Sequence, residues 1–151
     1  MTEAKLAPKV PDWMKDHVRR YLESNGADGH LLTLPSSPKP VPTLLLTTTG
    51  RRSGEKFFFP LIYGRAGNGY VVIASKGGAP AHPGWYSNLV ADPAVEVQVE
   101  NRRFRAKART ATGAERTRLW DEMAALFPPY TDYQRKAAGR EIPVVVLDPL
   151  P

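Results

Sequence analysis

The chain has 151 residues, contains no cysteine and carries a formal net charge of +6 at pH 7. This length fits one domain with a single core, and a hydrophobic content of 42% is typical of globular proteins. The lack of cysteine excludes disulfides, thiolate catalysis and cysteine-ligated clusters. The positive charge favours an anionic partner, which could be nucleic acid, anionic lipid or a small phosphorylated or carboxylated ligand. With neither a signal-peptide pattern nor a long apolar run, we expect a cytoplasmic protein.

Residues 1–40 are predicted to form an arm, a helix and a linker. Residues 1–11 show no apolar period and predict a mobile arm. An amphipathic helix capped by Asp12 can end at Asn25-Gly26, and residues 35–40, rich in proline and serine, predict a connector. The apolar side of the helix would carry Trp13, Met14, Val18, Tyr21 and Leu22. Either this side packs on the core beneath a solvated basic rim, or the helix makes a peripheral contact at the inner face of the plasma membrane.

Short strands dominate the rest of the chain. The predicted strands span residues 43–49, 56–65, 70–75, 95–99, 104–108 and 142–147. A hairpin turn at 66–69 and the short spacing of the first three strands predict an antiparallel meander. Six strands with few helices predict an α+β protein, mainly β, built as a small closed or partly closed barrel.

Two more helices are expected between the strands. Residues 83–90 could form a short helix that ends at Ala91-Asp92-Pro93. Thr112 and Glu115 have the spacing of a capping box, and the helix that they open would stop at Pro128-Pro129.

Tyr130 and Tyr133 follow this second helix, and we expect them in a loop before the last strand. Tyrosines there could cover a pocket, stack on a ligand ring or donate a proton to a developing oxyanion. They could equally well just plug the end of the barrel.

Two segments have the features of an anion site. In the first, Gly54 lets the backbone approach closely, Ser53 offers a hydroxyl, and the forks of Arg51 and Arg52 match phosphate oxygens. The second segment, Ser75-Lys76-Gly77-Gly78, again places a cation and glycines directly after a strand. A solvated hairpin turn would look the same, so the residues alone leave both interpretations open.

Other charged or metal-binding residue types give weaker signals. Four cations alternate along one predicted strand, at Arg103, Arg105, Lys107 and Arg109. Such a face is usually solvated, and because no aromatic residue shares it, nucleic-acid binding is disfavoured. The three histidines lack the spacing of metal ligands, so we expect no metal.

Four motifs, in order between about Val41 and Pro149, resemble the deazaflavin-dependent nitroreductase family of mycobacteria and their relatives. The motifs are LLLTTTGRRSGE, SKGGAPAHPGWYSNL with ADPAVEVQV, PPYTDYQ and IPVVVLDP. The resemblance implies that residues 41–151 form a split β-barrel like those of FMN-binding proteins. It also implies that this barrel binds coenzyme F420, a 5-deazaflavin with a phosphate and an oligoglutamate tail. The reduced cofactor would reduce small-molecule hydride acceptors, namely quinones, enones or nitroaromatics.

The resemblance also assigns residues by position. Cofactor contacts fall to Arg51, Arg52, Ser53, Gly54, Lys56, Pro60, Ala74, Ser75, Lys76, Gly77, Gly78, Trp85, Tyr86 and Asn88. Residues 51–54 would hold the phosphate, while Pro60, Ala74 and Ser75 would border the ring. Tyr130, Tyr133 or Ser75 would donate the proton that follows hydride transfer. The alternatives are an FMN- or haem-binding split barrel and a non-catalytic deazaflavin carrier, and the oligomeric state stays open.

Overall fold

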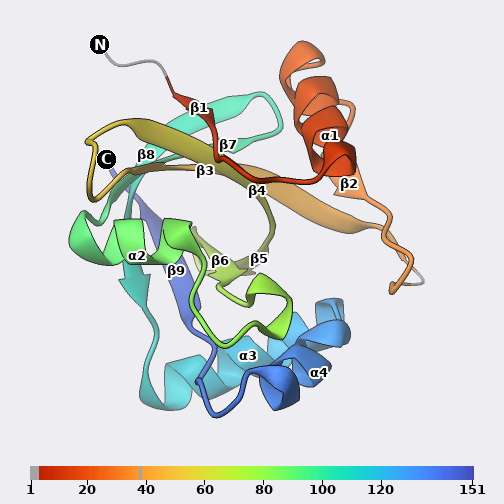
Figure 1. Ribbon diagram of the computed structural model, residues 1–151, viewed down its shortest axis with the longest axis vertical. Helices are drawn as coiled ribbons and strands as arrows, with labels where there is room; N and C mark the ends of the chain where they lie inside the picture. The colour runs from red at the N-terminus through yellow and green to blue at the C-terminus, as the bar shows by residue number, and fades with distance from the viewer. Residues whose placement is uncertain (1–3, 38) are drawn as a thin grey trace.

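One curved sheet organises the protein (Figure 1), whose computed structural model describes residues 4–37 and 39–151. The strands are β1 (Lys5–Leu6), β2 (Leu31–Leu32), β3 (Val41–Thr49), β4 (Lys56–Ile62), β5 (Gly64–Ala66), β6 (Gly69–Ile73), β7 (Ala94–Val99), β8 (Arg102–Thr110) and β9 (Val144–Pro149). The helices are α1 (Asp12–Glu23), α2 (Gly84–Ala91), α3 (Gly113–Leu126) and α4 (Pro129–Lys136), with a 3-10 turn, η1 (Lys76–Gly78). No helix in the described ranges is long and apolar enough to cross a membrane.

The sheet closes on itself because one stretch of chain, residues 56–66, pairs near both of its ends. The strands pair in the order β1-β4-β3-β7-β8-β9-β6-β5, and β2 pairs with β3. Only Tyr63 separates β4 from β5, so the run that starts beside β3 finishes beside β6. Counted this way, the described residues form a barrel of six principal strands, and the predicted mainly antiparallel barrel is confirmed. The expected strand 56–65 is interrupted at Tyr63, where the chain turns this corner.

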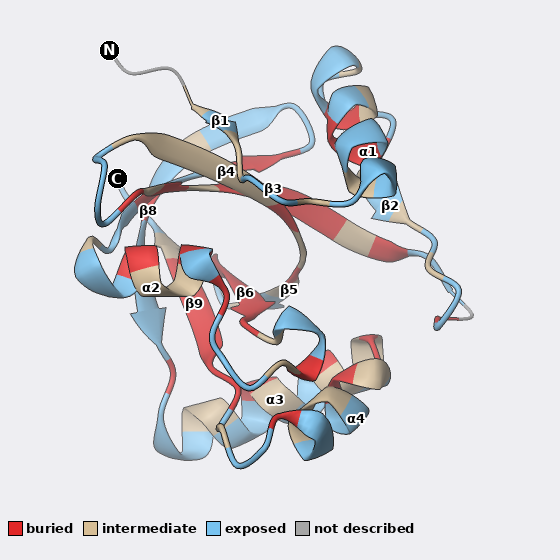
Figure 2. Cartoon of the chain, in the orientation of Figure 1, coloured by how far each residue is buried: buried red, intermediate tan, exposed pale blue. Residues whose placement is uncertain are grey.

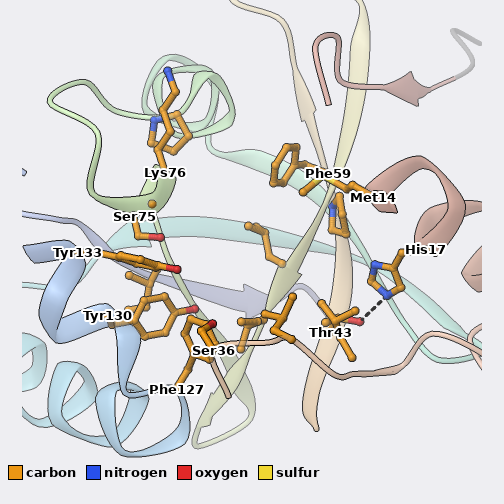
Figure 3. A pocket seen from close by; sticks show the side chains of 18 of the residues that line it. Met14, His17, Ser36, Thr43, Phe59, Ser75, Lys76, Phe127, Tyr130 and Tyr133 are labelled. Atoms are coloured by element: carbon orange, nitrogen blue, oxygen red, sulfur yellow. Dashed lines mark hydrogen bonds between the residues drawn. The ribbon is translucent and has the colours of Figure 1, made fainter. Parts of the chain in front are cut away.

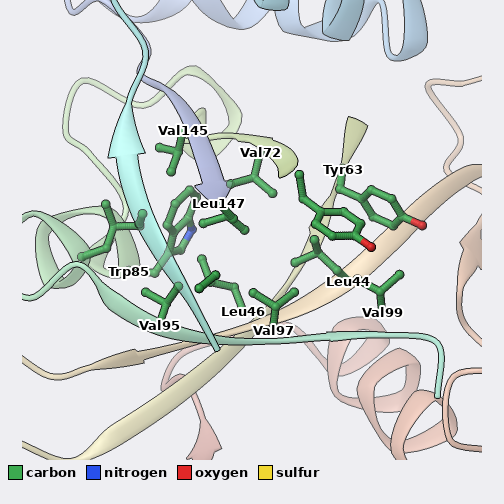
Figure 4. Packing of buried hydrophobic residues seen from close by; sticks show 14 of the residues in the cluster. Leu44, Leu46, Tyr63, Val72, Trp85, Val95, Val97, Val99, Val145 and Leu147 are labelled. Carbon is green, nitrogen blue, oxygen red and sulfur yellow. The ribbon is translucent and has the colours of Figure 1, made fainter. Parts of the chain in front are cut away.

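Several strands are buried on both faces (Figure 2). Leu44 and Leu46 of β3 lie in the barrel interior, whereas Leu45 packs under α1 on the outside. Residues 144–147 of β9 alternate in the same way between the interior and a cluster with α3 and α4. In Figure 4, Trp85 of α2 lies among the valines and leucines of the interior. The continuous apolar runs in the sequence follow from this burial on two faces.

Tyr21 fixes α1 to the barrel. Its hydroxyl donates to the carbonyl oxygen of Thr43 at 3.1 Å and accepts from the backbone N–H of Glu100 at 2.9 Å. The ring is fully buried, and this burial raises the pKa of Tyr21 to about 12. The basic rim of α1 is solvated, as one of the two interpretations expected, and Arg19 and Arg20 there pair with carboxylates such as Asp16.

Two predictions about the start of the chain were wrong. The arm is not free of regular structure, because Lys5 and Leu6 form β1 and pair in parallel with β4; residues 1–3 lie outside the described residues. Asp12 does not cap α1, since it is the first helical residue and Pro11 occupies the preceding position.

Two predictions near the end of the chain were also wrong. Thr112 precedes α3 as expected, but no capping box forms, because the carboxylate of Glu115 instead pairs with Arg109. The tyrosines lie in helix α4 and not in a loop. Proline is tolerated in the first helical turn, so Pro129, taken as a helix stop, in fact opens a new helix.

Candidate functional site

Two adjoining cavities open beside β4 and the η1 turn. The first has a volume of about 550 Å³ and the second of about 620 Å³. Both are lined by Met14, Phe59, Lys76, Pro83 and Trp85. Because these residues are common to the two linings, one elongated ligand can occupy both cavities.

The first cavity is largely apolar, with a few hydroxyls on one wall. Its walls come from α1, the segment 32–36, β4, β6 and α4. Figure 3 shows the hydroxyls of Ser75, Tyr130 and Tyr133 on one side of this space, with His17 and Thr43 across from them. Such a space suits a flat, mostly apolar ligand with polar atoms at its edge.

Tyr130 and Tyr133 present hydroxyls that other described residues do not engage in hydrogen bonds. The ring of Phe127 packs edge-on against Tyr130, with centroids 5.0 Å apart. Tyr130 is only 4% exposed, and this burial, followed by the neighbouring Tyr133, raises its pKa. The hydroxyl of Tyr130 therefore stays protonated at neutral pH and can act as a hydrogen-bond donor.

His17 also lines the first cavity and was missed as a site residue by the sequence reasoning. It is 1% exposed, and its Nε2 lies 2.7 Å from the carbonyl oxygen of Gly29, so Nε2 carries the hydrogen and donates it. Its Nδ1 is buried and has no partner among the described residues. Its place between Met14 and Tyr21 on the apolar side of the helix was the available signal.

The second cavity is electropositive. Its described lining contains four cationic side chains and no carboxylate; the cations are Lys9, Arg51, Arg52 and Lys76. Asn88 of α2 holds one of them in place, because its Oδ1 accepts from the backbone N–H of Arg51 at 3.2 Å and from Nη1 of the same residue at 2.8 Å. The amide Nδ2 of Asn88 donates in turn to Thr48 at 3.2 Å. The loop of residues 50–54, called here the arginine loop, is thus anchored to helix α2.

The η1 turn brings the two cavities together. Lys76, Gly77 and Gly78 all have positive φ, at 47°, 62° and 83°. Glycine adopts such angles freely, whereas Lys76 does so at a cost. In Figure 3, Lys76 points away from the tyrosine hydroxyls, and it lines both cavities.

The structure gathers most of the sequence-predicted site residues around these cavities. The first cavity takes Pro60, Ser75, Lys76, Gly77, Trp85, Tyr130 and Tyr133. The second takes Arg51, Arg52, Ser53, Lys76, Trp85 and Asn88. Five predicted residues line neither cavity, namely Gly54, Lys56, Ala74, Gly78 and Tyr86.

These five residues have other surroundings. Lys56 pairs with Glu96 at 3.3 Å, and the Tyr86 hydroxyl lies 2.9 Å from Oγ1 of Thr110. Ala74 packs in the barrel interior. The backbone N–H groups of Gly54 and Gly78 close the arginine loop and the η1 turn, to Gly50 and Ser75 respectively.

Comparison with known proteins identifies the family. Residues 13–149 match the sequence model of the F420H(2)-dependent quinone reductase family. An F420H(2)-dependent quinone reductase of Mycobacterium tuberculosis is 41% identical over 152 residues, which cover 91% of this chain and 97% of the relative. The resemblance that the four motifs indicated is therefore confirmed.

Solved structures support the same family and fold. An F420-H2-dependent reductase, FDR-A, superposes with a TM-score of 0.65 at 41% identity, over 71% of this chain and 94% of that one. A domain-swapped dimer superposes with a TM-score of 0.67 at 36% identity, over 91% and 98%. HutZ, a heme storage protein of Vibrio cholerae, has a TM-score of 0.56 at 17% identity over 72% and 82%, and shows the split-barrel fold alone. The chain belongs to the F420H(2)-dependent quinone reductase family, whose cofactor is coenzyme F420.

Proposed function

We propose that this protein transfers a hydride from reduced F420 to a quinone, and that enones and nitroaromatics are further acceptors of the same site. The observation that carries the proposal is the junction of two unlike cavities at Lys76 and Trp85. One cavity is apolar with hydroxyls at its edge, and the other is cationic. A cofactor with a flat ring at one end and anionic groups at the other needs this pairing.

The residues present fit the anionic part of the cofactor. Arg51 and Arg52 offer guanidinium forks, which bind phosphate and carboxylate oxygens through paired hydrogen bonds. Ser53 adds a hydroxyl beside them. Since the described lining has no carboxylate, no side chain there repels the tail. These residues would hold the phosphate and the first carboxylates, while Lys76 would lie where the ring meets the tail.

The residues also fit a flat ring and an acceptor. Pro60 and Phe59 of β4 give an apolar wall, and Ser75 and the tyrosines of α4 face the same space. When bound, reduced F420 supplies the hydride. The acceptor then carries negative charge on an oxygen, and a neighbouring hydroxyl can neutralise it by donating a proton.

Tyr130, Tyr133 and Ser75 are the candidate donors. Burial keeps Tyr130 neutral, so its O–H can stabilise the developing oxyanion. Tyr133 lies beside it, with ring centroids 6.2 Å apart. The apolar walls exclude water and so strengthen each of these hydrogen bonds.

The apolar lining favours quinones among the acceptors. Leu32, Leu34 and Phe127 contribute hydrocarbon surface to the first cavity. A quinone offers a flat ring that matches this surface and two carbonyl oxygens, of which one can reach the hydroxyl wall. Nitroaromatics are more polar, and we rank them lower.

An acceptor screen with reduced F420 tests the proposal. We expect turnover with quinones to exceed turnover with enones and nitroaromatics, as followed by the recovery of oxidised F420 absorbance. Fluorescence titration should show F420 binding at least about tenfold tighter than FMN, because FMN lacks the oligoglutamate tail. Equal or tighter FMN binding would reject the cofactor assignment in favour of a flavin-binding barrel. Tight F420 binding without turnover on any acceptor would instead indicate a carrier.

We propose a cytoplasmic location for the protein. A peripheral contact between α1 and the membrane has less support than the reductase activity. Trp13 is 50% exposed and lines the first cavity. At this place a tryptophan could hold the protein at a membrane surface and bring the cavity close to an acceptor dissolved in the lipid. However, Arg19 and Arg20 already pair with carboxylates, which weakens their attraction to anionic lipid. Co-sedimentation with anionic and with zwitterionic vesicles separates these cases.

A further inference from the structure

Arg140, in the segment between α4 and β9, makes an unusual set of contacts. Its guanidinium donates to three backbone carbonyls: Ser75 at 2.8 Å, Ala79 at 3.0 Å and Ala74 at 3.1 Å. It also lies 2.9 Å from Nδ1 of His82, which must accept the hydrogen. No carboxylate among the described residues pairs with Arg140. Burial lowers the pKa of its guanidinium group. The side chain is therefore committed to backbone carbonyls and not to an ion pair.

The three carbonyls flank the η1 turn. The turn begins after Ser75 and ends before Ala79, and its three residues all have positive φ. A backbone in this state persists only when its surroundings hold it there. Among the described residues, the turn itself has two backbone hydrogen bonds, from Gly78 to Ser75 and from Ala79 to Lys76. Arg140 adds side-chain hydrogen bonds to the carbonyl oxygens on either side of the turn, at Ser75 and at Ala79. It therefore holds both ends of the turn.

Arg140 is itself fixed to α4. The side-chain amide of Gln134 donates to the carbonyl oxygen of Arg140 at 2.7 Å and accepts from the backbone N–H of Ile142 at 2.9 Å. Gln134 follows Tyr133 directly in the same helix. The side chains of Gln134 and Arg140 thus connect helix α4 to the η1 turn.

We propose that Arg140 is a positioning residue that holds the η1 turn against α4 and thereby sets Ser75 and Lys76 in register with Tyr133. It lines neither cavity, so it acts through the residues that do. The proposal rests on the proposed function only in the identity of the ligand, because the contacts of Arg140 to the turn hold whatever binds there. The planar fork is essential, since its four contacts come from three nitrogen atoms, whereas an ammonium group has three N–H donors on a single atom.

The test uses the full-length protein and three variants. Arg140→Met removes the fork, and Arg140→Lys keeps the charge without the fork. Arg135→Met is the matched control, because Arg135 also follows the tyrosines but is 74% exposed and, among the described residues, forms an ion pair with Asp132 alone. Two quantities are measured for each: the dissociation constant of F420 by fluorescence titration, and amide hydrogen exchange of residues 76–79 against a peptide from β7.

We expect both Arg140 variants to weaken F420 binding by about tenfold or more and to speed exchange of residues 76–79, with exchange in β7 unchanged. Arg135→Met should match the parent protein. Full recovery of affinity and protection in Arg140→Lys would overturn the proposal, because the charge and not the fork would then matter. Unchanged exchange at 76–79 in both variants would overturn it as well.

The two readouts separate this inference from the proposed function. If the parent protein does not bind F420, the proposed function fails, while the exchange data still decide whether Arg140 holds the turn. If Arg140→Met does not fold, Arg140→Lys provides the same comparison, because it keeps the charge and most of the side-chain volume.

Discussion

A side-chain carbon placed on Gly78 would lie 2.7 Å from the carbonyl oxygen of Tyr133 and 2.9 Å from its Cα. The η1 turn and helix α4 therefore meet backbone to backbone, and no side chain fits between them. Since Gly78 also has a positive φ of 83°, glycine is needed there for two independent reasons. This contact sets the distance between Ser75 and Tyr133, which face the same cavity.

Gly78→Ala should consequently destabilise the protein far more than Gly77→Ala. Both residues have positive φ, which costs about 1–3 kcal/mol for a residue with a side chain. Only Gly78 adds a clash with backbone, because a side-chain carbon on Gly77 would meet nothing within 4 Å. Chemical denaturation of both variants measures the difference. Equal losses of unfolding free energy would show that α4 moves aside freely.

Tyr133→Phe should lower turnover much more than F420 affinity. The substitution removes one hydroxyl from the wall of the first cavity and leaves the ring packing in place. A lost proton donor typically costs about 100-fold or more in rate. Steady-state kinetics with a quinone, combined with a fluorescence titration of F420, provide both numbers. If turnover stays unchanged, Tyr133 is not the donor, and Tyr130→Phe and Ser75→Ala become the decisive variants.

Asn88→Ala should weaken binding of the anionic part of the cofactor. It removes the two hydrogen bonds that Asn88 accepts from Arg51 and leaves only the longer one to the carbonyl oxygen of Gly84 at 3.5 Å among the described residues, so the arginine loop is held less firmly. We expect F420 affinity to fall by about tenfold, the effect of losing a hydrogen bond to a charged group. A deazaflavin riboside that lacks the phosphate and tail serves as the control ligand, and its affinity should change little. An equal loss for both ligands would place the effect of Asn88 at the ring.

Alkaline pH should destabilise the fold through its buried tyrosines. Burial raises the pKa of Tyr21 from 10.0 to about 12, and it also raises the pKa of Tyr63 and of Tyr130. Between pH 10 and 12 the unfolded chain loses the proton of Tyr21 and the native protein keeps it, so stability is complete below pH 10 and falls as the pH rises. The raised pKa values of Tyr63 and Tyr130 act in the same direction. Tyr21 alone accounts for about 2–3 kcal/mol of this loss.

Denaturation midpoints measured from pH 8 to pH 12 check this expectation. Tyr21→Phe should flatten the decline above pH 10, even though it also loses the hydrogen bonds of the hydroxyl and starts from a lower stability. The slope, and not the absolute stability, is therefore the quantity to compare. An unchanged slope in the variant would mean that Tyr21 ionises in the folded state as readily as in the unfolded one.

Most of the barrel could be predicted from the sequence because its strands carry local signals. Alternating valines predicted β7, and a short polar turn predicted the hairpin into β6. Glycines beside cations indicated the loop at 50–54 and the η1 turn. Local pattern could not show that β4 and β5 turn a corner at Tyr63, because this break depends on closure with β6, far along the sheet. The same holds for β1, a two-residue strand that exists only because β4 offers an open edge.

The lining of the candidate site was predictable where the side chains belong to residues that closely follow a strand, as those of Arg51 and Lys76 do. It was not predictable where a residue acts through contacts distant in sequence. Arg140 binds the carbonyl oxygen of Ala74, 66 positions away. Asn88 was assigned to the cofactor by resemblance, but its contact with Arg51, 37 positions earlier, could not be seen in the local sequence. Helix α4 was missed for a local reason, since proline both ends one helix and begins the next.

The walls of the first cavity differ in how freely they can vary. The turn at Ser75 and helix α4 are tied together by Gly78 and Arg140, so a change in either disturbs the other. Helix α1 lines the first cavity with Trp13, Met14 and His17, whereas Leu32 and Leu34 of the segment 32–36 also pack against the cluster that contains Tyr130. Variation in acceptor preference among related enzymes should therefore accumulate first in α1, where a new side chain changes the shape of the cavity and leaves the packing of Gly78 against α4 intact.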